Sequence, residues 1–319
     1  MVAGTRAPPS YCASFLAARM LAAISKTRLR PSSTNFSVAY SPFVRYHVLL
    51  MSAFSLRCEL ISRAEQYARS QGLPFQQSYG EMPVVCFPPR DGRNGNFIPA
   101  SYKAIISNPA WKGRLNKVHP LGRTSLPPNE NGRWMELDSC TSSDALLMNI
   151  FCYPGVLRRK QTLELLGIEA ATEPCFGCRA RVPLIDGKVD RTEVDLRLGN
   201  LLIEAKLTES DFQRVGKRVL TTYRDFRDVF VVEQLPQTKT HFLSYQLLRN
   251  VLAAYALQCC FCVVLDDRRK SLLEAWYAVM RCVKPIELKT ALRVLTWQEL
   301  AKTLPLTLRR FLALKYGIV

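Results

Sequence analysis

Polar and apolar residues alternate along one stretch of the chain, residues 193–207, and this alternation predicts the central element. Two alternating runs flank Gly199-Asn200, a pair that suits a tight two-residue turn. The pattern predicts an antiparallel hairpin in which Leu198 faces Leu201. Because successive side chains of a strand point to opposite faces, one face of the hairpin is apolar, and we expect that face to be buried. It carries Val194, Leu196, Ile203, Ala205 and Leu207.

The other face of this hairpin is charged. Counting outward from the turn places Asp195 opposite Glu204, and Glu193 opposite Lys206. Like charges directly opposite one another weaken a sheet, so the opposition of Asp195 and Glu204 needs a reason. A divalent cation between the two carboxylates would reverse the sign of their interaction. Hard oxygen ligands with room left for water and a phosphate oxygen are the usual way in which proteins hold Mg²⁺.

Lys206 lies two residues beyond Glu204 on the same face. An ammonium group there would polarise an attacking water or stabilise developing negative charge. With the two acids, it completes the parts needed for phosphodiester hydrolysis. The other interpretation is an exposed amphipathic hairpin in which Glu193 and Lys206 form a surface ion pair. The opposed acids favour the metal site.

At these residues the sequence resembles the PD-(D/E)XK nuclease superfamily, which has the restriction-endonuclease-like fold. Its motif is an acidic residue in one strand, followed on the next strand by Glu-x-Lys in an apolar run. The counterparts here are Asp195 and Glu204-Ala205-Lys206. The resemblance implies that Asp195 and Glu204 bind Mg²⁺, for which Mn²⁺ can substitute. It also implies that Lys206 assists the water and that the Ala205 carbonyl is a further ligand.

Other features of the superfamily have weaker counterparts. Val194 stands where the motif has a proline, which is often missing in the superfamily. Glu193 is assigned a supporting catalytic role from the strand edge. A helix before the motif strands sometimes supplies one more acid, and Glu136 and Asp144 are the candidates. Asp144 also suits the first turn of a helix, where it would interact favourably with the helix dipole.

Basic and glutamine residues after the motif are the candidates for nucleic-acid binding. A helix is expected over residues 210–227 and another over 244–257, where several superfamily nucleases place a glutamine near the site. The candidates are Arg214, Lys217, Arg218, Gln246 and Arg249. A solvated helix face has the same composition, so both interpretations stay open. They also stay open for the basic and aromatic stretch over 101–123.

Composition agrees with a polyanionic partner. The 319 residues include 44 Lys and Arg against 26 Asp and Glu, a formal net charge of +18. Basic side chains that displace phosphate counterions supply most non-specific nucleic-acid affinity, so DNA is the expected partner, with RNA left open. No uninterrupted apolar run reaches the ~20 residues of a spanning helix, and no membrane partner is expected.

The 11 cysteines, without a convincing secretory signal, indicate a reduced compartment, and the cytoplasm is the expected location. Cys175 and Cys178 form a lone CxxC, which lacks the second pair that a zinc site needs.

We expect a basic extension followed by one elaborated domain. Residues 1–50 contain six basic residues and no acid, which suits an organellar transit peptide or a segment upstream of a true start at Met51. The second account is favoured, and the segment is not counted as fold. Residues 51–135 are expected to form a helical and loop elaboration, and 136–319 the nuclease core. Apolar spacing in that core predicts further helices over 142–153, 156–166, 272–282 and 298–315, and strands over 259–267 and 293–297.

The sequence therefore predicts a mixed α/β, restriction-endonuclease-like domain that hydrolyses DNA phosphodiester bonds with Mg²⁺. Water attack without a covalent enzyme intermediate is the implied chemistry. The main alternative is a nucleic-acid-binding protein that uses the same basic surface without turnover. A third is an interaction module whose charge serves solubility or an acidic protein partner. A homodimer, which many restriction-like enzymes need for double-strand cuts, stays open.

Overall fold

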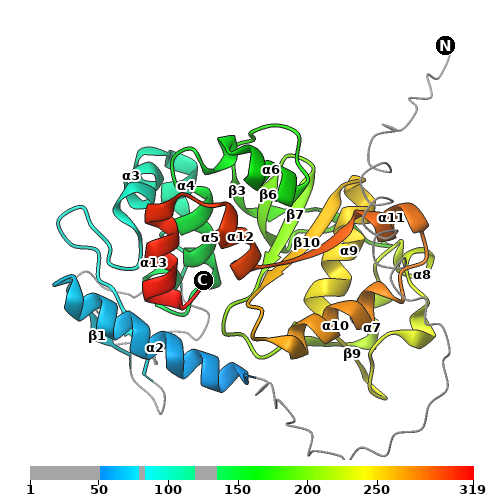
Figure 1. The fold of residues 1–319 in the computed structure, drawn as a ribbon. Coiled ribbons are helices and arrows are strands. Elements are labelled where there is room, and N and C mark those ends of the chain that lie inside the picture. The colour runs from blue at the N-terminus through cyan, green and yellow to red at the C-terminus, as the bar shows by residue number, and fades with distance from the viewer. Residues whose placement is uncertain (1–50, 79–82, 119–134) are drawn as a thin grey trace, which may run out of the picture. The chain divides into compact units, whose positions relative to one another are not determined.

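A five-stranded mixed sheet organises the residues that the computed structural model describes, which are 51–78, 83–118 and 135–319 (Figure 1). The expected extension over residues 1–50 lies outside them. The strand order across the sheet is β11–β10–β7–β6–β3. In chain order these strands are β3 (Cys175–Arg179), β6 (Glu193–Leu198), β7 (Leu201–Ala205), β10 (Cys260–Leu265) and β11 (Leu292–Thr296).

The sheet combines an antiparallel meander with a parallel half. β3, β6 and β7 pair in antiparallel fashion, whereas β7, β10 and β11 run parallel. Leu198 pairs with Leu201, so the expected hairpin register at the turn is confirmed. Gly199 in that turn has a φ of 55°, a left-handed value that glycine adopts without a steric penalty. The mixed sheet with helices on its faces confirms the predicted α/β, restriction-endonuclease-like architecture.

The other elements surround this sheet. The α-helices are α2 (Ala53–Ser70), α3 (Pro99–Ser107), α4 (Pro109–Arg114), α5 (Ser143–Phe151), α6 (Lys160–Leu166), α7 (Lys217–Leu220), α8 (Phe226–Val229), α9 (Tyr245–Leu257), α10 (Lys270–Met280), α11 (Ile286–Ala291), α12 (Trp297–Thr303) and α13 (Leu306–Tyr316). Small two-stranded sheets pair β1 (Gln76–Gln77) with β2 (Val85–Cys86), β4 (Val182–Pro183) with β5 (Val189–Asp190), and β8 (Arg214–Gly216) with β9 (His241–Leu243). No helix within the described ranges is long and apolar enough to cross a membrane.

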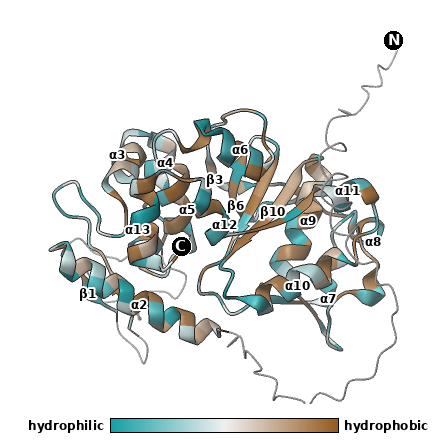
Figure 2. Ribbon diagram, in the orientation of Figure 1, coloured by the Kyte–Doolittle hydropathy of each residue, from teal (hydrophilic) through white to brown (hydrophobic). Residues whose placement is uncertain are grey.

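Helices cover both faces of the sheet, whose strands are mainly hydrophobic (Figure 2). Leu202 and Phe261 pack on one face with α9 and α10. Ile203 packs on the other face with α5, α12 and α13. β7 is therefore buried on both faces, whereas the sequence pattern led us to expect one buried face. The reason is its place in the middle of the sheet, between β6 and β10.

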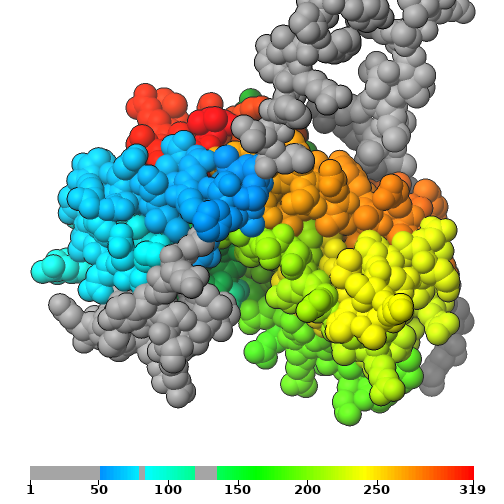
Figure 3. Space-filling model, turned by 90° about the horizontal axis from the view of Figure 1, so that it is seen from below, coloured from blue at the N-terminus to red at the C-terminus, as the bar shows by residue number. Residues whose placement is uncertain are grey.

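Most helices and strands expected in the core are present at nearly the expected bounds. α5 begins after Ser142, whose Oγ accepts a hydrogen bond from Ala145 N at 3.1 Å. α9, α10, β10 and β11 also lie within or close to their expected ranges. Seen from below, the N-terminal elements (blue to cyan) and the segment leading into α9 (yellow) lie on the two sides of one face (Figure 3).

Two expected helices are wrong. The helix expected over residues 210–227 is replaced by β8 and the short helices α7 and α8. Gln213 has a left-handed φ of 63°, which breaks a right-handed helix, and β8 instead pairs with β9. The helix expected over 298–315 is divided into α12 and α13 at Pro305, since a proline inside a helix removes a backbone donor.

Candidate active site

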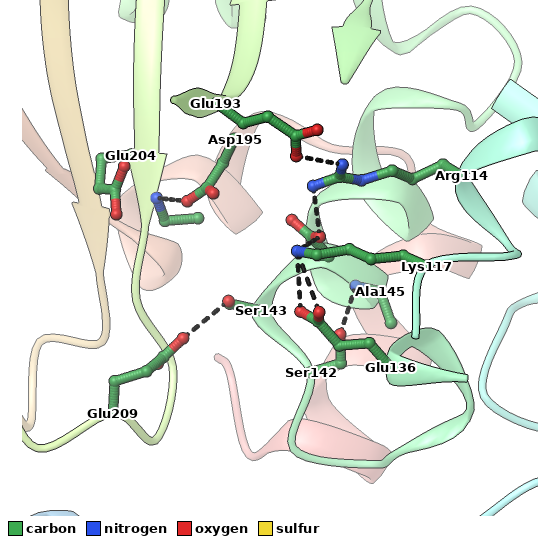
Figure 4. A network of polar contacts seen from close by, with 12 residues as sticks. Arg114, Lys117, Glu136, Ser142, Ser143, Ala145, Glu193, Asp195, Glu204 and Glu209 are labelled. Carbon is green, nitrogen blue, oxygen red and sulfur yellow. Dashed lines mark hydrogen bonds and ion pairs between the residues drawn. The ribbon is translucent and has the colours of Figure 1, made fainter. Parts of the chain in front are cut away.

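Asp195 and Glu204 lie on the neighbouring strands β6 and β7, at the end of the hairpin away from its turn (Figure 4). The hydrogen-bonded ladder ends at Leu196 and Ile203, and these two acids are the next residues in the same register. Beyond that point the Asp195 carboxylate replaces a backbone partner, because its Oδ2 accepts a hydrogen bond from Ala205 N at 2.8 Å. Both acids line one cavity of about 610 Å³.

Glu204 is only 1% exposed, and both of its carboxylate oxygens have partners. Oε1 accepts from Lys206 Nζ at 2.8 Å, and Oε2 accepts from Asn250 Nδ2 at 2.7 Å. Asn250 belongs to α9, so this helix orients the carboxylate from the neighbouring layer. The alternative in which Glu193 and Lys206 form a surface ion pair is wrong, since Lys206 is buried and pairs with Glu204.

Burial and neighbouring charges shift the pKa values of Asp195 and Lys206. Burial raises the pKa of Asp195 well above its ordinary value, and the nearby carboxylates of Glu204 and Asp144 raise it further. Burial by itself disfavours the Lys206 ammonium, but the carboxylates, Glu204 first, raise the pKa of Lys206. The lysine is therefore a protonated hydrogen-bond donor at neutral pH. The carboxylates near Asp195 disfavour its negative charge, and a bound cation would offset this repulsion.

Two cations from the N-terminal half close the other side of the site (Figure 4). Arg114 Nη1 donates to Glu193 Oε2 at 2.7 Å, and Arg114 Nη2 donates to Asp144 Oδ2 at 2.8 Å. Lys117 Nζ lies 2.7 Å from Asp144 Oδ2 and 3.0 Å from Glu136 Oε2. The two acids that the superfamily resemblance suggested, Glu136 and Asp144, are thus held beside the site by ion pairs.

A glycine in β3 makes room for this contact. Gly177 has a φ of 62°, and a Cβ there would lie 2.3 Å from Arg114 Nη1 and 3.0 Å from Glu193 Oε2. Any larger side chain would occupy the space of the ion pair. The backbone of β3 therefore approaches the guanidinium group more closely than other residues allow.

Glu209 joins α5 to the segment that follows β7. Its Oε1 accepts from Ser143 Oγ at 2.8 Å, and its Oε2 accepts from Leu207 N at 2.7 Å. The sequence gave no reason to choose Glu209 or Asn250, because neither has a fixed spacing from the motif. Glu209 also contributes to the raised pKa of Lys206.

The expected nucleic-acid-binding residues divide into two groups. Gln246 and Arg249 line the 610 Å³ cavity, and Arg249 Nη2 also donates to the Glu193 carbonyl at 2.8 Å. The other three candidates, Arg214, Lys217 and Arg218, are not among the residues that line it. They were placed near the site by the helix expected over 210–227, which is absent.

Other cations line the cavity in their place. Arg114, Lys117, Arg179 and Arg191 all contribute to its wall. Arg114 and Lys117 come from the basic and aromatic stretch over 101–123, which the sequence left undecided. Arg179 ends β3, Arg191 lies just before β6, and neither carried a separate signal in the sequence.

The hairpin supplies a donor set that suits a hard cation. Asp195, Glu204 and the Ala205 carbonyl offer oxygen ligands, which Mg²⁺ prefers, and the cavity leaves room for water and phosphate. In the described part of the chain, no group of three or more His, Cys, Asp or Glu side chains is arranged to hold a metal ion. The fit therefore rests on the two hairpin carboxylates. Cys175 and Cys178 are free thiols.

Comparison with known families connects this geometry to a group of proteins. Residues 63–317 match a family model described as "Restriction Endonuclease associating with ARP". Neither a curated protein nor a solved structure matched the chain. The matched residues include the whole sheet, α5, α9 and the hairpin that carries the acids. Since the match covers most of its length, the chain belongs to this restriction endonuclease family.

Proposed function

We propose that this protein is a Mg²⁺-dependent endonuclease of the PD-(D/E)XK type that hydrolyses DNA phosphodiester bonds. The observation that carries the proposal is the hairpin site. Asp195 and Glu204 line one cavity, and the Lys206 ammonium lies 2.8 Å from Glu204 Oε1. The family description, which names a restriction endonuclease, supports the same activity.

Each residue of the hairpin has a role in this proposal. Asp195 and Glu204 hold the metal ion, with the Ala205 carbonyl as a further ligand, and Mn²⁺ is expected to substitute. When bound, Mg²⁺ supplies Lewis-acid polarisation of the phosphate and lowers the pKa of the attacking water. Asn250 fixes the orientation of Glu204 through its 2.7 Å hydrogen bond.

Lys206 acts as a donor in this scheme and not as a general base. Its raised pKa keeps the ammonium protonated, and one of its three N–H groups is already donated to Glu204. The remaining N–H groups can orient a water or stabilise negative charge that develops on the phosphate. Glu193, with 40% of its side chain exposed at the cavity, supports the water from the strand edge.

The cationic wall of the cavity supports a nucleic-acid substrate. Arg249 and Gln246 from α9 face the same cavity as the acids, and the whole chain carries a net charge of +18. These groups suit backbone phosphates, whose contacts position a nucleic acid without reading its sequence. The family description also names an association with ARP, so we propose a protein partner in addition to DNA.

The test is cleavage of supercoiled plasmid by purified protein with Mg²⁺, beside the Lys206→Ala and Lys206→Gln variants. We expect the wild type to cleave and both variants to lose at least about 100-fold in rate, because a charge-stabilising donor is removed. Lys302→Ala, which removes an exposed lysine of α12, is the matched control and should cleave like the wild type.

Circular dichroism establishes that each variant is folded before its rate is compared. Cleavage that survives both Lys206 substitutions in folded protein would rule out this site. A wild type that binds DNA but cuts neither DNA nor RNA with Mg²⁺ or Mn²⁺ would favour the alternative of a binding protein without turnover.

A further inference from the structure

The segment between β3 and β6 carries three arginines that the proposed chemistry does not use. Arg179 and Arg181 are exposed, and they alternate with the buried residues Ala180 and Val182. Ala180 and Val182 pack into the core, whereas the two arginines lie at the surface. We call residues 179–192, which include β4 and β5, the arginine arm.

Strand pairing brings the third arginine to the same place. Arg179 pairs with Glu193 in the large sheet, and Val182 pairs with Asp190 in the small sheet. Arg181 and Arg191 lie in the two short segments that join these paired regions. The arm therefore gathers like charges, of opposite sign to the acids of the hairpin.

These three arginines line a second cavity. It measures about 310 Å³ and is lined by Arg179, Arg181 and Arg191. Arg179 and Arg191 also line the 610 Å³ cavity that holds the acids, so the two cavities adjoin. Among the residues that the structure describes, none of the three guanidinium groups has a carboxylate partner or a side-chain hydrogen bond. The trio is a set of unneutralised cations beside the site.

Hydrogen bonds to Asp190 hold the backbone of the arginine arm in position. Tyr223 Oη donates to Asp190 Oδ2 at 2.6 Å and lies 3.0 Å from Tyr245 Oη at the start of α9. Asp190 Oδ1 accepts from Thr192 N at 2.8 Å, so the acid nearest the trio in sequence is committed to other partners. Arg181 itself has a left-handed φ of 53°, which is uncommon for a residue other than glycine. The guanidinium groups therefore project from a fixed backbone.

We propose that Arg179, Arg181 and Arg191 form a second phosphate site, which takes one backbone phosphate of the nucleic acid next to the phosphate that is cut. Guanidinium groups bind phosphate oxygens through paired, charge-assisted hydrogen bonds. An anion held by the three arginines lowers their mutual repulsion. The proposal rests on the proposed nuclease function for the identity of the ligand, and the adjoining cavities set its place on the substrate.

The test is the salt dependence of DNA binding without divalent metal. Affinity for a DNA duplex is measured by fluorescence anisotropy in EDTA, over about 50–200 mM salt, for the wild type and the triple Arg→Gln variant of the trio. Each neutralised phosphate adds about 0.9 to the slope of log K against log salt. If the trio shares one phosphate, the triple variant lowers the slope by about 0.9 although three charges are lost.

The matched control removes the same charge elsewhere. Lys302, Arg309 and Arg310 are exposed on α12 and α13, and their triple Gln variant should keep the wild-type slope. Arg181→Gln alone, which touches only the smaller cavity, should weaken binding about tenfold. All these residues are exposed, and circular dichroism verifies that the variants fold.

The outcomes separate this site from the nuclease proposal. A slope equal to that of the control variant would show that the trio is only a solvated surface. A decrease of about 2.7 in the slope would show three separate phosphate contacts and would also overturn a shared site. A wild type that never cleaves refutes the nuclease while the binding slopes still decide this site. If the trio variant and the control variant have equal slopes while the wild type cleaves, only the second phosphate site is refuted.

Discussion

Two groups of like charge differ in their surroundings, the acid pair of the hairpin and the three arginines of the arginine arm. Asp195 and Glu204 follow the register of β6 and β7, and Glu204 is 1% exposed. Arg179, Arg181 and Arg191 are exposed and line one cavity. Water screens the exposed arginines, so their repulsion is small, whereas the buried Glu204 and the partly buried Asp195 repel more strongly because less water surrounds them.

The two groups of charges differ in how strongly their surroundings indicate a bound ligand. The buried acids are surrounded by donors, with Asn250, Lys206 and the Ala205 amide each bonded to one of them. Their environment is built to hold negative charge, which favours a resident cation. The exposed arginines have no such environment, and the case for an anion there depends on their shared cavity.

The largest effect is expected from Asp195→Asn, which removes the buried repulsion. Cleavage should fall by at least about 1000-fold, because the proposed metal site loses one of its two carboxylates. Metal-free stability should rise, on the order of 1–2 kcal/mol, because the neutral amide no longer repels Glu204. Plasmid cleavage and urea unfolding in EDTA measure the two effects. Asp91→Asn, at an exposed loop aspartate, is the control and should change neither.

The Asp195→Asn substitution should also remove part of the pH dependence of the stability. The native pKa of Asp195 is raised above its ordinary 3.8, so the native state binds more protons than the unfolded state. Stability of the metal-free wild type should therefore fall as pH rises from about 4 through the raised pKa. Burial also raises the pKa of Asp138 to about 6, with the same sign. Identical pH profiles for wild type and Asp195→Asn would contradict the buried-pair interpretation.

An intermediate effect is expected from Asn250→Ala, which leaves one Glu204 oxygen without its donor. Activity or metal affinity should fall about 10–100-fold, as is usual for residues that orient a metal ligand. Stability should fall by about 1–3 kcal/mol, because a buried acceptor loses its partner. Asn149→Ala is the matched control, since Asn149 is equally buried and bonds the backbone elsewhere. It should lose stability while folded protein keeps its cleavage rate.

The last prediction concerns stability alone and tests how closely β3 approaches the Arg114–Glu193 ion pair. Gly177→Ala places a Cβ against the Arg114 guanidinium, whereas Gly187→Ala has the same kind of positive φ with open space around it. Both should pay the left-handed penalty of about 1–2 kcal/mol, and Gly177→Ala should cost about 1–3 kcal/mol more. Thermal or urea unfolding compares them. Equal losses would mean that the Arg114–Glu193 contact does not depend on β3.

The local parts of the fold were predictable from the sequence. Apolar spacing gave α5, α9 and β10, because helix and strand periods are set by neighbouring residues. It failed over 210–227, where Phe212 and Tyr223 lie at helical spacing but are buried in an irregular segment. The left-handed Gln213 and the β8–β9 pairing overrode the local preference. The basic residues assigned to that helix therefore do not line the 610 Å³ cavity.

What the sequence by itself determined is the opposition of Asp195 and Glu204, since a two-residue turn fixes the register of a hairpin through contacts between near neighbours. Only the tertiary structure decided which residues surround these acids. Asn250 is 46 positions from Glu204, and Arg114 is 79 positions from Glu193. No local periodicity encodes such distant pairs. They form because helix packing on the sheet brings remote segments to the end of one hairpin.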